Sequence, residues 1–342
     1  MQCILKKEEN ELKKIFTILV ALCLGLSFTL GLVGCKNKKD TIRLNEVTHS
    51  VFYAPLYVAI NKGFMEDENI KIELNSGQGS DVSMAALLSG NADVALLGPE
   101  TVVYVHANGS TNHPMVFGQL TKRDGSFLVS RTKYTDFNWQ RDLAGKTVIA
   151  GRRGGMPAMT FEYVCNRNGL INGSNITLDL DPSFGAMVPT FQGGKGDFCT
   201  MFEPTATEFV NSGLGYMVGS VGEFSGEIPY TCFMAAPKFM KNHPDKIRGF
   251  LRAITRAYNF IMTSDSNTVA EALLPSFDGS TKASLAIAVD SYKRIDAWMA
   301  TPAMTEASYN RLIDVLHNSG TLDKSKTVKF SDVIDNSFAL SL

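Results

Sequence analysis

Two short glycine-containing segments carry the residues best suited to holding a small molecule. The first, Gly98 to Thr101, follows the apolar stretch 94–97, and the second, 151–157, follows the apolar stretch 148–150. Each apolar stretch predicts a buried strand, and glycine lets the backbone come close to a bound group. The first amides of a helix lack partners within it and point, with the helix dipole, at whatever lies in front of them. We therefore expect two ligand-binding turns that face one cleft.

The charged residues near these turns could bind either a hydrogen-bond donor or an anion. Glu100 and Glu203 each follow a predicted strand, and Glu227 lies close to another. Carboxylates at the ligand would accept hydrogen bonds from amino or ring N–H groups and would repel an anion. Arg152 and the glycine amides of the second turn would instead favour an anion such as a sulfonate. We expect an aminated or N–H-bearing heterocycle and keep the sulfonate as the alternative.

The other candidates lie in loops that follow predicted strands, where aromatic side chains could stack on a flat ring. Several candidates also have a structural explanation. The two glutamates could complement a helix start, and Arg152 and Arg153 could be solvated or pair with a carboxylate across the cleft, Arg153 in particular. His49 equally suits a polar loop. The residues expected at the ligand are Asn45, His49, Phe52, Tyr53, Gly77, Gly79, Gly98, Glu100, Thr101, Gln119, Arg152, Gly154, Gly155, Met156, Phe184, Phe202, Glu203, Glu227 and Tyr230.

Strand-like and helix-like segments alternate along the chain from residue 41. Repeated strand–loop–helix units predict an α/β fold with parallel strands, helices on the sheet faces and ligands beyond the carboxyl ends of the strands. The segments 121–125 and 226–230 are the candidate crossings between two lobes, so that lobe 1 comprises 41–124 and 231–342 and lobe 2 comprises 125–230. Strands are expected at 42–47, 70–74, 94–97, 116–120, 126–130, 148–150, 176–180, 198–202, 216–221 and 231–235. Helices are expected at 51–60, 82–88, 157–168, 187–191, 246–264, 269–274, 281–300 and 306–319.

The N-terminal residues 1–34 predict an export signal. Four lysines between positions 6 and 14 precede an uncharged run from 15 to 33, which ends in Leu32-Val33-Gly34-Cys35. This ending resembles the bacterial lipoprotein signal, which implies that Cys35 is lipidated and that 35–40 form a tether. An uncleaved transmembrane anchor is the alternative, because the run is long enough to span a bilayer. Either arrangement places the folded part outside the cytoplasmic membrane.

The composition of the chain reduces the classes of function that remain possible. The 342 residues are 44% apolar and 20% charged, which is enough for two ordinary domains. The formal net charge of −1 provides no basic field, so nucleic-acid binding is excluded. Beyond Cys35 the chain keeps Cys165, Cys199 and Cys232, an odd number without zinc-ligand spacing. We expect buried free thiols, no metal, no cofactor and a monomer.

Three motifs resemble a known family. Tyr53 to Ala59 (YAPLYVA) with Lys62-Gly63-Phe64, then Leu88 to Val94 (LSGNADV) and Asp142 to Thr147 (DLAGKT), are similar to the substrate-binding proteins of the aliphatic sulfonate, taurine and thiamine-precursor ABC importers. The likeness covers essentially the whole mature chain. It implies a type II periplasmic-binding-protein fold, with two α/β lobes, two crossover segments and a cleft that closes on the solute.

The resemblance also implies partners, namely an ABC permease and its ATPase, and leaves the solute open. A thiamine pyrimidine precursor is our leading expectation, with a sulfonate, taurine or a nitrate-type anion as the alternative. Pyrimidine-synthesising enzymes share this fold, so an enzyme is the alternative of another class. The sequence contains no Gly-x-Ser-x-Gly elbow, phosphate loop or His-Glu-x-x-His motif, and the export signal argues against biosynthesis. We therefore expect capture of a solute without catalysis.

Overall fold

The computed structural model describes residues 40–342 of the chain. The predicted export signal, Cys35 and positions 35–39 of the predicted tether lie outside the described residues. Within 40–342, no helix combines the length and the apolar character that crossing a bilayer requires.

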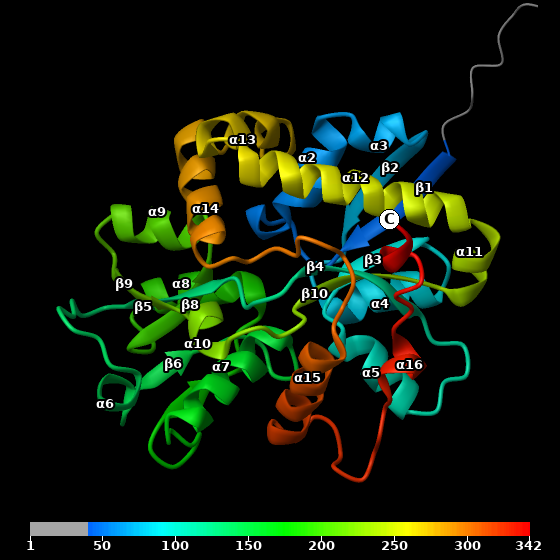
Figure 1. Ribbon diagram of the computed structural model, residues 1–342. Coiled ribbons are helices and arrows are strands. Elements are labelled where there is room, and N and C mark those ends of the chain that lie inside the picture. Colours follow the sequence, from blue (N-terminus) through cyan, green and yellow to red (C-terminus); the bar gives the residue numbers. More distant parts are fainter. Residues whose placement is uncertain (1–39) are drawn as a thin grey trace, which may run out of the picture. The chain divides into compact units, whose positions relative to one another are not determined.

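Two five-stranded sheets organise residues 40–342, each covered by helices, which confirms the predicted α/β fold with two lobes (Figure 1). The first sheet has the order β2-β1-β3-β10-β4 and the second the order β7-β6-β8-β5-β9. The first contains β1 (Asp40–Glu46), β2 (Ile70–Ser76), β3 (Val94–Leu97), β4 (Met115–Thr121) and β10 (Thr231–Ala235). The second contains β5 (Ser126–Ser130), β6 (Thr147–Ile149), β7 (Thr177–Asp179), β8 (Phe198–Phe202) and β9 (Tyr216–Ser220). We call the parts around these sheets the first and the second lobe.

The prediction of purely parallel strands is wrong for one strand in each sheet. In the first sheet β10 is antiparallel to both β3 and β4, and in the second β5 is antiparallel to both β8 and β9. The remaining pairs of β1 and of β6 are parallel. Both exceptions are the first strand after a crossing between lobes. The chain therefore enters each of these strands from the side of the other lobe, and the strand runs opposite to its neighbours.

Helices cover both faces of the first sheet. Figure 1 shows α12 above β3 and α4 below it. In α12 the apolar residues recur every three or four positions, from Ile247 through Phe250, Ile254 and Ala257 to Ile261, and all are buried. This spacing gives the helix one apolar face, which contacts α2, α3 and β2. The helices of this lobe include α2 (Ala54–Asn61), α3 (Phe64–Asp67), α4 (Ser80–Leu88), α5 (Glu100–Ala107), α11 (Pro237–Asn242), α12 (Pro244–Thr263) and α13 (Ser266–Leu273), with the 3-10 helices η2 (Val51–Tyr53) and η4 (Leu274–Ser276).

The second lobe is built from shorter helices. Its longest, α7, begins directly after the second glycine turn and carries Pro157 in its first turn, where a missing N–H costs no hydrogen bond. Two short helices, α6 and α10, were not expected from the sequence. The helices are α6 (Trp139–Leu143), α7 (Met156–Arg167), α8 (Met187–Gln192), α9 (Thr205–Asn211) and α10 (Val221–Ser225), with the 3-10 helix η3 (Phe184–Ala186).

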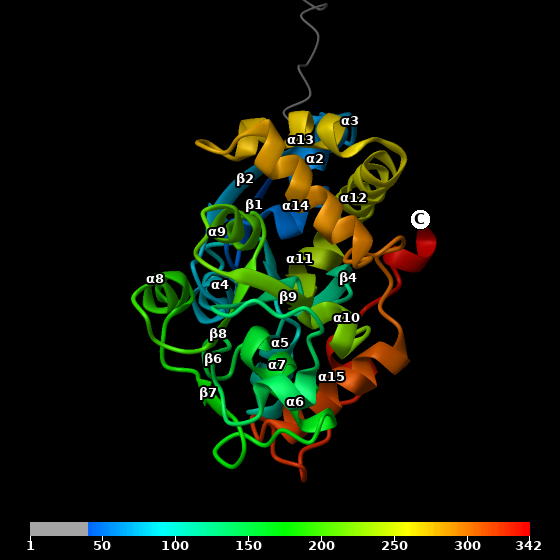
Figure 2. The same cartoon turned by 90° about the vertical axis from the view of Figure 1, so that its left-hand side faces the viewer.

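The C-terminal helices contact both lobes (Figure 2). Besides its contacts in the first lobe, α14 (Lys282–Arg294) packs on α9, while α15 (Glu306–Asn318) packs on α7 and α16 (Phe330–Val333) packs on α5. The short η5 (Ala339–Ser341) ends the chain. The predicted helix 281–300 is wrong beyond Arg294, because Asp296 adopts a left-handed φ of 53°. The chain then runs beside β4, where the Met299 amide donates to the Leu120 carbonyl at 2.9 Å.

The two predicted crossings run side by side. The amide of Ile228 donates to the carbonyl oxygen of Lys122 at 2.9 Å, and that of Tyr230 donates to that of Thr121 at 3.1 Å. The ammonium group of Lys122 also forms an ion pair with Asp296 at 2.8 Å. The connections between the lobes are therefore tied to each other and to the segment that follows α14.

The three remaining cysteines are buried and unpaired, as expected. Burial raises the pKa of the Cys165 and Cys199 thiols to about 12. They therefore stay protonated at neutral pH and serve as small apolar core residues.

Candidate ligand-binding cleft

A cavity of about 340 Å³ lies between loops of the two lobes. The first lobe contributes the loops after β1, β2 and β3, and the second contributes the loops after β6 and β7 and the end of β8. Ligands of α/β sheets bind at this edge, beyond the carboxyl ends of the strands, and the volume is within the range of small-molecule sites. The lining residues are Val47, Thr48, Ser50, Tyr53, Gln78, Gly79, Ser80, Gly98, Glu100, Arg152, Gly155, Met156, Pro157, Ser183, Phe184, Gly185, Phe202, Tyr230 and Thr231.

Both glycine turns line this one cavity. Gly98 and Glu100 come from the first turn, while Arg152, Gly155 and Met156 come from the second. A Cβ at Gly98 would lie 2.0 Å from Oε2 of Glu100, so any larger residue there would displace the carboxyl group. In the second turn the amide of Gly155 donates to the carbonyl oxygen of Arg152 at 3.1 Å. That amide already has an acceptor within the protein, which weakens the case for an anion-binding turn.

Glu100 is the first residue of α5 and is only 1% exposed. Its Oε2 atom has no hydrogen-bond partner among the described residues, although buried carboxyl oxygens are normally bonded. Burial raises the pKa of this carboxyl group to about 8, against the smaller opposing effect of the Arg152 charge. The group is therefore mostly protonated at pH 7. In that form it offers the cavity both an O–H donor and a carbonyl acceptor.

Aromatic rings form much of the cavity wall. Tyr53 and Tyr230 line it beside the first sheet, and Phe184 and Phe202 line it from the second lobe with ring centroids 5.6 Å apart. Phe52 is fully buried behind this wall, with its ring centroid 5.6 Å from that of Tyr53 and 5.7 Å from those of Tyr230 and Phe202. Such walls suit a flat, weakly hydrated ring better than a hydrated ion.

Arg152 is the only cationic side chain among the described residues that line the cavity. Its guanidinium group donates to Oδ1 of Asp81 at 3.1 Å. Asp81 lies in the first turn of α4, so this ion pair joins the first lobe to the second. The Arg152 hydrogen bond holds the pKa of Asp81 below its ordinary value. The carboxylate therefore stays ionised and neutralises Arg152 at physiological pH.

Comparison with known proteins places this architecture in a family. A family model described as NMT1/THI5 like matches residues 51–267. The chain belongs to the NMT1/THI5-like family. A relative from Bacillus subtilis (strain 168), named "Putative binding protein YtlA", is 36% identical over 305 residues, which span 88% of this chain and 91% of that protein.

Solved structures with the same fold are far more distant in sequence. The periplasmic nitrate-binding protein NrtA from Synechocystis PCC 6803 superposes with a TM-score of 0.72 at 15% identity, over 88% of this chain and 87% of that one. The alkanesulfonate-binding protein SsuA from Xanthomonas axonopodis pv. citri, bound to MOPS, gives 0.69 at 14% identity, over 86% and 98%. The NMT1/THI5-like chain therefore has the periplasmic-binding-protein fold that its motifs implied.

Glu203 of this NMT1/THI5-like protein does not line the cavity. It is 2% exposed and accepts hydrogen bonds from the Thr207 amide at 3.0 Å, the Thr207 hydroxyl at 2.8 Å and the Ser291 hydroxyl at 2.9 Å. These hydrogen bonds provide an acceptor for the Thr207 amide near the start of α9, and they join α9 to α14. The structural explanation applies here, because the partners already occupy both carboxylate oxygens. We therefore leave Glu203 out of the proposed site.

Glu227 is also outside the cavity. Its half-exposed carboxylate lies 3.8 Å from the Lys122 ammonium and 3.9 Å from the Arg123 guanidinium, beside the crossings. Arg153 is exposed and lies outside the lining, so the ion pair across the cleft involves Arg152 instead.

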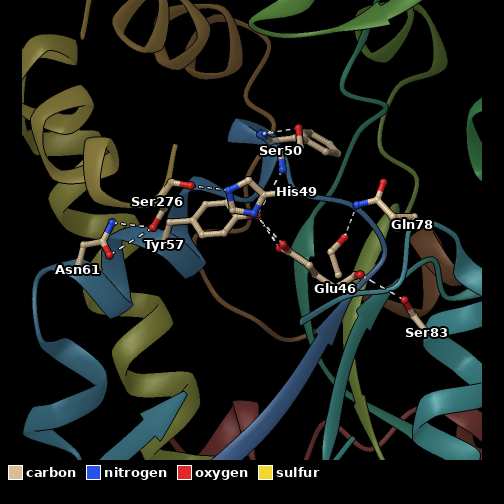
Figure 3. Close-up of polar contacts among 10 residues, drawn as sticks. Glu46, His49, Ser50, Tyr57, Asn61, Gln78, Ser83 and Ser276 are labelled. Atoms are coloured by element: carbon tan, nitrogen blue, oxygen red, sulfur yellow. Dashed lines mark hydrogen bonds and ion pairs between the residues drawn. The ribbon is translucent and has the colours of Figure 1, made fainter. Parts of the chain in front are cut away.

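His49 lies beside the cavity but is held by groups outside it (Figure 3). Its Nδ1 lies 2.8 Å from Oε1 of buried Glu46, and its Nε2 lies 2.6 Å from the carbonyl oxygen of Ser276. The Tyr57 hydroxyl donates to the other Glu46 oxygen at 2.5 Å. Because both ring nitrogens face acceptors, only the imidazolium form donates both bonds, and the Glu46 hydrogen bond raises the pKa of His49. His49 therefore anchors the β1 loop, whose residues Thr48 and Ser50 line the cavity.

Among the other predicted residues outside the lining, Thr101 and Gly77 shape the loops that line the cavity. The Thr101 hydroxyl donates to the Gly98 carbonyl at 2.7 Å and fixes the first glycine turn. A Cβ at Gly77 would lie 2.4 Å from the Ser83 hydroxyl oxygen and 2.9 Å from Oδ1 of Asn45, so this glycine permits close packing. The remaining such residues are Phe52 behind the aromatic wall, Gln119 within β4 and Gly154 in a separate surface depression.

The sequence reasoning missed nine lining residues, several of which are hydroxyl-bearing. All except Thr231, which is the first residue of β10, follow the same strand ends as the predicted ones, and this position was the available signal. They are Val47, Thr48, Ser50, Gln78, Ser80, Pro157, Ser183, Gly185 and Thr231. Among residues 40–342, no three His, Cys, Asp or Glu side chains are grouped so as to hold a metal ion.

Proposed function

We propose that this protein is the extracytoplasmic solute-binding component of an ABC importer and that its solute is a flat heterocycle with an amino group beside a ring nitrogen. A thiamine pyrimidine precursor is the leading case. The carrying observation is Glu100, a buried carboxyl group at the cavity whose Oε2 atom has no hydrogen-bond partner within residues 40–342. Leaving such an atom unbonded is costly, and a ligand that satisfies it recovers that free energy.

The carboxyl group of Glu100 and an amino group beside a ring nitrogen are complementary in their hydrogen-bond donors and acceptors. A protonated carboxyl group can donate its O–H to a ring nitrogen while its carbonyl oxygen accepts from the adjacent amino group. If the proton moves to the ring nitrogen, the same two hydrogen bonds remain and become charge-assisted. The aromatic walls provided by Phe184, Phe202 and Tyr230 would cover the faces of the ring.

An anionic solute such as a sulfonate or nitrate fits the cavity less well. Its natural partner, Arg152, is already paired with Asp81, and the Gly155 amide already has an acceptor. The low-sequence-identity structures that bind these anions share the fold, and fold alone does not fix the solute. Neutral or weakly basic heterocycles avoid the cost of bringing a second negative charge beside Asp81.

The mechanism is capture without chemistry. Loops of both lobes line the cavity, so a solute can contact both only when the lobes are together, and binding shifts the population towards that state. Among the described residues, the lining contains no histidine and no cysteine. The loaded monomer, anchored to the membrane through lipidated Cys35, would then deliver the solute to a permease driven by its ATPase.

Calorimetric titration of the purified full-length protein tests the proposal. The probes are 4-amino-5-hydroxymethyl-2-methylpyrimidine, the same pyrimidine without its amino group, 1-propanesulfonate, taurine and nitrate. We expect the aminopyrimidine to bind and the analogue without the amino group to bind at least about tenfold more weakly, because it loses one hydrogen bond to a carboxyl group. Binding of a sulfonate or nitrate, with none of the aminopyrimidine, would contradict the proposal.

Variants at Glu100 sharpen the test. Glu100→Leu should weaken the aminopyrimidine by roughly 10- to 150-fold, the equivalent of about 1.5–3 kcal/mol for hydrogen bonds to such a group. Glu100→Gln can still donate and accept and should retain most of the affinity. The exposed Glu208→Gln is the matched control and should behave as wild type. Equal affinities of wild type and Glu100→Leu would remove Glu100 from the site.

A further inference from the structure

The ion pair between Arg152 and Asp81 stands at the edge of the cavity. Arg152 lines the cavity from the second lobe, and Ser80, next to Asp81, lines it from the first. The Asp81 side chain is 65% exposed and that of Arg152 is 48% exposed, so the pair lies at the open side and not in the core. No other ion pair across the cavity is formed by the described residues that line it.

The charges around the cavity cancel at neutral pH. The carboxyl group of Glu100 is mostly neutral because its pKa is about 8, which leaves Arg152 as the lining cation and Asp81 as its counterion. Removal of the Asp81 charge alone would leave one uncompensated positive charge facing the cavity. Such a charge, in a guanidinium group that can donate two parallel hydrogen bonds, is the usual recognition element for a sulfonate or carboxylate.

We propose that Asp81 is the residue that sets the charge of the solute, by occupying the Arg152 guanidinium and so excluding anions from the cavity. The inference rests on the proposed function only in taking this cavity as the solute site. The pair does not need to be strong to act in this way. An anion that approached Arg152 would also be repelled by the Asp81 carboxylate beside it, whereas a neutral ring would not.

A second effect of the pair must be separated from this one. Because Asp81 and Arg152 belong to different lobes, their loss also changes the equilibrium between open and closed forms, and this change alters the affinity of every solute by the same factor. The ratio of two affinities in one variant is free of that factor. Selectivity, rather than affinity, therefore reports the role of Asp81.

The experiment measures the dissociation constants of 1-propanesulfonate and 4-amino-5-hydroxymethyl-2-methylpyrimidine by calorimetry at pH 6.5 and low salt. The full-length proteins are wild type, Asp81→Asn, Arg152→Gln, the double variant and Asp314→Asn. Asp314 is exposed on α15 and lines no part of the cavity, so its substitution makes the same change in net charge elsewhere. Melting temperatures verify that each variant is folded.

We expect Asp81→Asn to bind the sulfonate at least about tenfold more tightly than wild type, relative to the pyrimidine, as a charge-assisted hydrogen bond becomes available. The double variant should lose this gain, and Asp314→Asn should match wild type. A folded Asp81→Asn protein with no gain in sulfonate binding would overturn the proposal, as would an equal gain in Asp314→Asn. Failure of wild type to bind the pyrimidine would refute the proposed function. The role of Asp81 would then be decided by the sulfonate affinity of Asp81→Asn relative to that of Arg152→Gln, which loses the same ion pair between the lobes.

Discussion

Glu100 should make the protein less stable as the pH rises, and this effect can be measured without any ligand. In the unfolded chain its carboxyl group loses its proton near the ordinary pKa of 4.5, whereas in the folded protein it does so at about 8. Between these values unfolding releases a proton, so the free energy of unfolding falls as the pH rises, by up to about 1.4 kcal/mol per pH unit. From pH 5 to pH 7 the fall amounts to about 2.5 kcal/mol.

The substitution Glu100→Gln isolates this contribution, because glutamine has nearly the same shape and no ionisable proton. The stability of the variant minus that of wild type should therefore grow by about 2.5 kcal/mol between pH 5 and pH 7. For a folded unit of about 300 residues this corresponds to a shift of about 4 °C in the difference between melting temperatures. Any effect of the glutamine amide on stability that does not depend on pH cancels, because only the change in the stability difference between pH 5 and pH 7 is used.

Differential scanning calorimetry of wild type, Glu100→Gln and Glu208→Gln at pH 5, 6 and 7 provides the measurement. Glu208 is exposed on α9, so its variant should follow wild type at every pH. If the melting temperatures of wild type and Glu100→Gln instead change in parallel, the carboxyl group titrates normally. The description of Glu100 as a buried, protonated group would then be wrong.

Four further outcomes follow from the geometry. The affinity of wild type for the aminopyrimidine should fall about tenfold from pH 7 to pH 9, as the protonated form of Glu100 is depleted, while calorimetric titration of Glu100→Gln should show no such fall. Gly98→Ala should cost at least about tenfold in affinity, because the new Cβ would lie 2.0 Å from the Glu100 oxygen; wild-type binding by this variant would show that the carboxyl group is not needed in place. Glu203→Ala should lower stability in urea by about 2 kcal/mol yet leave solute affinity unchanged, and a large loss of affinity would return Glu203 to the site. The advantage in melting temperature of wild type over His49→Gln should be greatest at pH 6 and decline above pH 6.5 as the raised pKa of His49 is passed, whereas a constant advantage would argue against the imidazolium.

The strand ends that form the cleft were predictable because they depend on local sequence. Apolar runs such as 94–97 and 148–150 are followed at once by glycine, and the parallel arrangement brings such ends to one edge. Which of the two glutamates lines the cavity was not predictable from local sequence. Glu100 and Glu203 both lie close to the end of a strand and the start of a helix, and the local sequence does not show which of them meets a partner. Glu203 meets Ser291, which is 88 residues away in the sequence.

Long-range pairing also explains the other differences. The helix expected over 281–300 has no glycine or proline at Arg294 to end it, and its end depends on the backbone of Asp296 and on hydrogen bonds of the next segment to β4. The partner of Arg152 could not be read from the sequence because Asp81 is 71 residues away, in the other lobe. Residue spacing identified where a ligand could bind, and tertiary contacts determined which charges remain available there.

The position of β10 has a consequence for the order in which the protein can assemble. β10 lies between β3 and β4 in the first sheet, yet the whole second lobe separates it in sequence from both. The second sheet draws all its strands from the continuous stretch 126–220 and can be completed as soon as that stretch is available. β4 has to wait for residues 231–235 before it gains its neighbour. The second sheet should therefore be completed before the first, whose strand β4 can join β1, β2 and β3 only after β10 has formed.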